Sequence, residues 1–259
     1  MAIINFYKEE GETPLEAVHR FQIKARPYRN GTFGRDSRFL NSKITYAGRL
    51  DPLAEGVLIL LTDDDVHKKE DFLKLPKEYE FEVLFGFKTD TGDILGKILE
   101  NYDSNFSIKE AEAMIPKILP GFLGKSVQTY PVYSSKTVAG KPLFTYARNE
   151  KEVRLPVKDI EIFSIEYLGS KEISSGGLLS DIVRRIGKVR GDFRQSEILN
   201  LWTYKLTDLK TDFVVSKFKV SASSGFYVRV LAEQIGEKIG TPSLAYRIKR
   251  TKVGNYHII

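Results

Sequence analysis

The stretch "YAGRLDPLAEGVLILL" (residues 46–61) places one carboxylate, that of Asp51, between a basic residue and a proline, directly before an apolar run. A proline holds the residue before it in an extended conformation, and the run itself is expected to pass from helix to buried strand. A carboxylate beside buried apolar groups needs a nearby cation, because desolvation otherwise favours its neutral form. Two interpretations follow: Asp51 caps a turn, or it is a nucleophile balanced by a cation.

The composition is that of an ordinary globular protein, with 259 residues, 42% of them hydrophobic and 29% charged. The net charge of +6 favours a polyanionic partner such as nucleic acid, although a basic enzyme without such a partner fits equally well. The absence of cysteine excludes disulfides, thiolate nucleophiles and cysteine-ligated zinc, and the three histidines lack metal-ligand spacing. Neither a signal peptide nor an apolar run of membrane length is present, so a cytoplasmic location is predicted.

Local patterns predict helices and strands in mixed order. Thr13 to Glu16 and Ser107 to Glu110 have the spacing of capping boxes, which predicts helices over residues 14–24 and after Ser107. Apolar residues alternate in "KEYEFEVLFGF" (77–87), which predicts a strand with one buried face. Residues 218–240 are expected to form a strand, a turn and a helix. Because no regular strand–helix–strand repeat is present, an α+β fold is favoured.

No linker divides the chain, so residues 1–259 are predicted to form a single domain. The loop at 24–43 is rich in arginine and lysine and is suited to contact a phosphate backbone. The segment 174–202 is predicted to be a helical insertion with a basic face. For both segments, an ordinary solvated surface is an equally good interpretation.

Four motifs together resemble the TruB-type tRNA pseudouridine synthases, which make pseudouridine in the T-loop of tRNA. They occur in family order, between about residues 3 and 257, and are "YAGRLDPLAEGVLIL", "KEYEFEVLFGFKTDTGD", "QTYPVYSSKTVAGKPLFTYAR" and "SASSGFYVRVLAEQIGEKIG" with "RIKRTKVGNY". The resemblance implies a pseudouridine synthase fold, with a mixed, mostly antiparallel sheet flanked by helices and loops. It also implies an isomerase that acts on RNA as a monomer and needs no cofactor and no metal.

The resemblance assigns catalytic roles to three residues. Asp51 is the aspartate that attacks the flipped uridine, Tyr79 stacks on the target base, and Arg229 pairs with Asp51. The residue types agree with these roles, since a flipped base needs a π-face and a desolvated aspartate needs a fixed cation. The expected substrate-binding residues are Lys8, Tyr46, Lys136, Tyr146 and Arg148.

The sequence also departs from the family pattern. Tyr46 occupies the place of the family's histidine, Glu9 stands where a proline follows the N-terminal lysine, and no C-terminal PUA-type module is expected after residue 259. Three alternatives stay open. The chain is a ribosomal-RNA pseudouridine synthase, a catalytically weak RNA-binding or RNA-folding protein, or a hydrolase that uses Glu55 as a second carboxylate.

Overall fold

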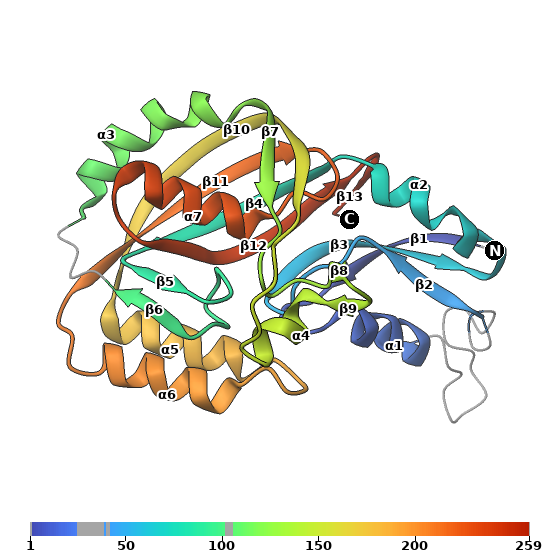
Figure 1. Cartoon of the computed structure of the whole chain (residues 1–259), viewed down its shortest axis with the longest axis horizontal. Helices are drawn as coiled ribbons and strands as arrows, with labels where there is room; N and C mark the ends of the chain where they lie inside the picture. The colour runs from blue at the N-terminus through green and yellow to red at the C-terminus, as the bar shows by residue number, and fades with distance from the viewer. Residues whose placement is uncertain (1, 25–38, 40–41, 102–105, 259) are drawn as a thin grey trace.

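The computed structural model describes residues 2–24, 39, 42–101 and 106–258, so most of the basic loop predicted at 24–43 lies outside the described residues. One long, twisted sheet organises the chain (Figure 1). Its strands, in spatial order, are β1 (Ala2–Lys8), β3 (Ala54–Thr62), β12 (Ser243–Val253), β4 (Lys77–Phe85), β11 (Asp212–Ala222), β10 (Val157–Ser174) and β7 (Gly124–Thr129). Two shorter strands extend it, with β2 (Ile44–Ala47) paired to β3 and β13 (Tyr256–His257) paired to β12.

The pairs of this sheet are antiparallel except for β12 with β3, which run parallel. Two small hairpins lie outside it, β5 (Phe87–Thr89) with β6 (Ile98–Asn101) and β8 (Thr137–Val138) with β9 (Lys141–Pro142). The mixed, mostly antiparallel sheet of an α+β protein is therefore confirmed.

Helices cover the two faces of the sheet. The helical segments are α1 (Pro14–Lys24), η2 (Asp63–Lys68), α2 (Lys69–Lys74), α3 (Ile108–Ile118), η3 (Leu119–Phe122), α4 (Leu143–Arg148), α5 (Ser175–Ile186), α6 (Gln195–Leu206) and α7 (Val228–Ile239). Figure 1 shows α7 crossing the front of the sheet, with α5 and α6 side by side below. Within the described ranges, no helix is long and apolar enough to cross a membrane.

The alternation predicted in residues 77–87 is confirmed in β4, where it separates two cores. Tyr79, Phe81 and Val83 pack with α3 and α7, whereas Leu84 packs on the opposite face with α5 and α6. Both capping boxes are also confirmed, since the hydroxyl of Thr13 accepts from Glu16 N and that of Ser107 accepts from Glu110 N. Local pattern therefore determines these elements.

The apolar run after Asp51 forms a turn at Leu53 and then strand β3 from Ala54 onward, so the expectation of a helical beginning was wrong. Its side chains alternate between two separate cores, with Val57 and Ile59 in one and Leu58 and Leu60 in the other. A strand buried on both faces is apolar at every position, and its sequence therefore lacks a period of two.

The segment 174–202 forms α5 and most of α6. Leu178 and Ile182 of α5 pack with Trp202 of α6 against the sheet. The expected basic face is wrong for Arg185, which is fully buried. Its Nε donates to Glu10 at 2.7 Å, and its Nη1 donates to a main-chain carbonyl of β12 at 2.7 Å. These contacts anchor the helix pair.

We predict that Gly56→Ala destabilises the protein by about 3 kcal/mol or more in urea unfolding. Gly56 has φ 113°, and a Cβ there would lie 2.2 Å from the Arg250 carbonyl oxygen, because β3 and β12 approach closely. Gly176→Ala is the control, since its Cβ would meet nothing within 4 Å and it lies in α5. That variant should be neutral or more stable, by about 0.5–1 kcal/mol. Equal effects of the two changes would contradict the prediction.

Candidate active site

Asp51 lies in the turn between β2 and β3, with its main-chain carbonyl accepting from Ala54 N at 3.0 Å. Lys8 supports this turn from within the protein. Its fully buried ammonium donates to the carbonyls of Glu9 and Pro52, each at 3.1 Å, and of Ala54 at 2.5 Å. Three acceptors use all three donors of a lysine. The predicted contact of Lys8 with substrate is therefore corrected: Lys8 positions the turn that carries Asp51.

Arg250 of β12 supports the same turn from its other side. Its Nε donates to Val57 O at 2.8 Å, Nη1 to Arg49 O at 3.2 Å and Nη2 to Gly48 O at 3.1 Å. A guanidinium offers five donors in a rigid fork, which suits a cluster of carbonyl oxygens. The turn that carries Asp51 is thus held by two buried cations, Lys8 on β1 and Arg250 on β12.

Burial lowers the pKa of the Lys8 ammonium from 10.5 to about 8. It also lowers the pKa of Lys77, the first residue of β4, from 10.5 to about 8. Between pH 8 and 10 the unfolded chain then binds more protons than the folded protein. The free energy of unfolding should therefore rise with pH in this interval, by about 1–3 kcal/mol. Urea unfolding at pH 8 and 9.5 measures it. Lys77→Met should make the free energy of unfolding rise less steeply with pH. The control Lys74→Met, at an exposed lysine, should leave the rise unchanged. A parent protein whose stability does not change between the two pH values would contradict the prediction.

Arg229 lies in the first turn of α7 and points back to Asp51. Its Nε donates to Asp51 Oδ2 at 2.8 Å, and Nη2 donates to Asp51 Oδ1 at 3.4 Å. The remaining donors reach two main-chain carbonyls, with Nη2 to Tyr133 O at 3.0 Å and Nη1 to Thr91 O. Burial alone would lower the pKa of Arg229, but the charges of Asp51 and Asp93 outweigh it and raise the pKa.

The ion pair is asymmetric in its exposure to solvent. The Arg229 side chain is 4% exposed, whereas that of Asp51 is 39% exposed. A fixed, buried cation therefore holds a carboxylate that remains accessible to a ligand. This arrangement fits the nucleophile interpretation of Asp51 better than the turn-cap interpretation.

The segment before α7 is fixed by Gln128 of β7. Its side chain accepts from Tyr227 N at 2.7 Å and donates to Tyr227 O at 3.2 Å. Gln128 is buried, and the paired bonds set where α7 begins and hence where Arg229 stands.

A cavity lies beside Asp51 and Arg229. Tyr79 of β4 is part of its lining. Its ring lies near that of Phe226, with a centroid separation of 6.5 Å. Burial raises the pKa of Tyr79, partly offset by Arg250, so its hydroxyl stays protonated at neutral pH. The cavity is about 460 Å³ in volume, large enough for a small ligand or an extruded base. Its lining includes Asp51, Tyr79, Tyr133, Phe226, Arg229 and Arg250.

Asp93 is a second carboxylate in this cavity that the sequence analysis did not single out. Oδ1 accepts from the Thr91 hydroxyl at 2.8 Å and from Leu95 N at 2.9 Å. Burial raises the pKa of Asp93, while Arg229 opposes that rise. The only sequence signal for it was its place in the turn "TDTGD", where an aspartate is usual. Glu55, the earlier candidate, lies on β3 outside the lining of this cavity.

Of the other predicted substrate-binding residues, Arg148 lines the cavity, whereas Lys136, Tyr146 and Tyr46 do not. Lys136 follows Ser135, a lining residue, and its Nζ lies 5.2 Å from the Tyr130 ring centroid. Tyr146 donates through its hydroxyl to Val138 O at 3.0 Å. Tyr46 is outside the cavity, on β2, with Lys69 Nζ 5.6 Å from its ring centroid.

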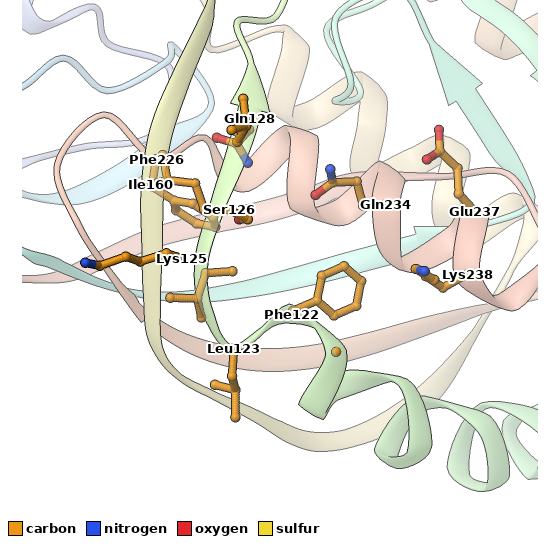
Figure 2. Close-up of a pocket in the computed structure, with 13 residues that line it drawn as sticks. Phe122, Leu123, Lys125, Ser126, Gln128, Ile160, Phe226, Gln234, Glu237 and Lys238 are labelled. Atoms are coloured by element: carbon orange, nitrogen blue, oxygen red, sulfur yellow. The ribbon is translucent and has the colours of Figure 1, made fainter.

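A second cavity, of about 500 Å³, lies between β7, η3 and α7 (Figure 2). It shares Phe226 with the first, but Asp51, Tyr79 and Arg229 do not line it. In the part of the chain that the structure describes, no group of three or more histidine, aspartate or glutamate residues could hold a metal ion.

The fold is that of the pseudouridine synthases. The structure aligns with that of Cbf5 in a solved structure titled "Crystal Structure of a Cbf5-Nop10-Gar1 Complex" with a TM-score of 0.56 and 17% identity, covering 98% of this chain and 49% of that one. The model of the TruB family pseudouridylate synthase (N terminal domain) matches residues 37–176. The chain belongs to the TruB family.

Two relatives show the extent of the similarity. The tRNA pseudouridine synthase B of Aquifex aeolicus (strain VF5) is 31% identical over 194 residues, which cover 71% of this chain and 61% of that protein. That of Thermosipho melanesiensis (strain DSM 12029 / CIP 104789 / BI429) is 28% identical over 258 residues, covering 100% of this chain and 66% of that protein. The chain thus spans less than two thirds of the length of either relative.

Proposed function

We propose that this chain converts a uridine in the T-loop of tRNA to pseudouridine. One observation carries the proposal: the accessible Asp51 carboxylate, fixed by buried Arg229, lines one cavity with the Tyr79 ring. The relatives named tRNA pseudouridine synthase B support tRNA as the substrate.

The chemistry is an isomerisation of one nucleotide. The bond between N1 of uracil and C1′ of the ribose breaks, the base turns, and a bond between C5 and C1′ forms. The hydrogen on C5 leaves and N1 gains a proton, so atoms balance without a donor or an oxidant. A uridine stacked within the T-loop is out of reach of Asp51, so it must be flipped into the cavity. Tyr79 then stacks on it, and Asp51 acts as the nucleophile.

The RNA backbone is proposed to lie against the segment that borders the cavity. Lys136, Lys141 and Arg148 are exposed there, and Phe144, 37% exposed, lines the cavity beside them. Exposed cations beside an accessible ring suit phosphate contact with stacking. A monomeric, cytoplasmic enzyme built as a single domain is part of the same proposal.

The test uses hairpin RNAs labelled with tritium at C5 of uridine, because the C5–hydrogen bond breaks only when pseudouridine forms. A tRNA T-loop hairpin should release tritium, and the same hairpin with cytidine at the modified position should not. Release from ribosomal-RNA hairpins alone would shift the substrate to that class. Tight binding of the T-loop hairpin without release would identify an RNA-binding protein instead.

A further inference from the structure

The loop between α5 and α6, residues 187–194, forms one wall of the cavity that holds Asp51. Phe193 and Arg194 line this cavity. The loop is fixed from within by Gln195, whose amide donates to Val189 O at 3.1 Å and to Gly191 O at 2.7 Å. The helix pair that the sequence marked as an insertion therefore delivers a defined surface to the site.

Arg194 makes two contacts on the cavity wall. Its Nη1 donates to Asp90 Oδ2 at 2.7 Å and its Nη2 to Asp90 Oδ1 at 3.3 Å, a bidentate pair. The same guanidinium lies over the Tyr133 ring, 4.5 Å from its centroid. Both side chains of the ion pair are largely shielded, 19% exposed for Arg194 and 17% for Asp90. Planar pairing and stacking together are an arginine-specific combination.

These contacts join the two segments that hold Arg229. Tyr133 supplies the carbonyl that accepts from Arg229 Nη2, and Thr91, next to Asp90, supplies the carbonyl that accepts from Nη1. One segment is the turn after β5, and the other precedes β8. Apart from Asp51, the acceptors of Arg229 are the carbonyl oxygens of Thr91 and Tyr133. The positions of these two oxygens therefore depend on Asp90 and Tyr133, the residues that Arg194 contacts.

The backbone at Arg194 supports a dedicated role. Its φ of 63° and ψ of 25° lie in the left-handed region, which an arginine rarely adopts. Such conformations persist where surrounding contacts impose them, often beside functional sites.

We infer that Arg194 is a positioning residue for the Arg229–Asp51 pair, supplied by the loop between α5 and α6. The inference rests on the proposed function for its catalytic consequence. Arg194 engages protein groups rather than a ligand, so its loss displaces the acceptors of Arg229. An ångström-scale misplacement of a catalytic group lowers turnover by one to two orders of magnitude.

Steady-state kinetics on T-loop RNA compare Arg194→Ala, Arg194→Lys and the control Arg190→Ala. Arg190 is an exposed arginine of the same loop, so Arg190→Ala removes the same positive charge as Arg194→Ala. Arg194→Ala should lower kcat by about tenfold or more with KM changed less than about threefold. Arg194→Lys, which keeps charge but loses the planar fork, should recover only part of kcat. In Arg190→Ala, kcat should equal that of the parent.

Hydrogen exchange of the RNA-free protein tests the same inference without any substrate. Arg194→Ala should speed exchange in residues 89–93 and 130–136, while helices α5 and α6 stay as protected as in Arg190→Ala. Identical exchange and kcat in the Arg194→Ala and Arg190→Ala variants would overturn the inference. If the parent forms no pseudouridine, the proposed function fails, and the exchange result alone decides whether Arg194 holds the two segments.

Discussion

Asp51→Asn should reduce pseudouridine formation by at least about 10³-fold, the scale seen when a nucleophile is removed. Asparagine has the shape of aspartate and can still accept a bond from Arg229 Nε, but its amide is not a nucleophile. Because Asp51 is 39% exposed and the turn is held by Lys8 and Arg250, the variant should fold and bind RNA. Tritium release under single-turnover conditions, with binding by filter retention, separates the two effects.

Asp64→Asn is the matched control, since it makes the same chemical change at an exposed acid of η2. Its rate should equal that of the parent. Asp51→Asn should also destabilise the protein by about 1–3 kcal/mol, because it leaves the buried Arg229 charge without its counter-charge. Turnover within tenfold of the parent would remove Asp51 from the nucleophile's role.

Arg229→Ala should abolish turnover and destabilise the fold by about 3 kcal/mol or more. The side chain is 4% exposed and serves Asp51 and two main-chain carbonyls, so its removal leaves buried acceptors without donors. Arg229→Lys keeps the charge but cannot reach three acceptors, and should lose about 10²-fold in kcat. RNA binding should persist in both variants, because the guanidinium faces protein groups.

The control for Arg229 is Arg184→Ala, which removes an arginine whose side chain is 53% exposed on α5. It should change the free energy of unfolding by less than about 1 kcal/mol and leave kcat intact. Stability comes from urea unfolding and kcat from tritium release. Full activity of the Arg229→Lys protein would show that charge alone is needed and that the fork geometry is not.

The local elements were predictable because their signals are local. Capping boxes at Thr13 and Ser107 and the alternation in β4 depend on neighbours along the chain, and the structure confirms them. The start of β3 was not predictable, because a strand buried on both faces has no alternation of apolar and polar residues to distinguish it from a helix.

The candidate site required a different source of information. The bond between Arg229 and Asp51 joins residues 178 positions apart, and no periodicity predicts such a pair. Their motifs, in family order, led to the prediction that they meet, and the structure brings them together. Their roles, with that of Tyr79, remain predictions.

The sequence pattern did not predict which charged residues are buried. Arg250 lies in the charged strand "RIKRTK", where each basic residue has the pattern of a solvated face, yet it is 1% exposed. Lys8 was assigned to substrate from the family resemblance, and it too is fully buried. Both are buried because carbonyl oxygens of distant segments converge on them, and that convergence exists only in three dimensions.

Because Arg250 donates hydrogen bonds to the turn that carries Asp51, this turn can reach its final conformation only after β12 has been synthesised. Arg250 is 202 residues from Gly48, so a ribosome synthesises the turn with Asp51 long before the guanidinium that holds this turn. A nascent chain can form β1 with β3 early, but the parallel pairing of β3 with β12 must await the later strand. Contacts of such long sequence separation form late in folding. Under the proposed function, a nascent chain should therefore become active toward RNA only after β12 has been synthesised and has paired with β3.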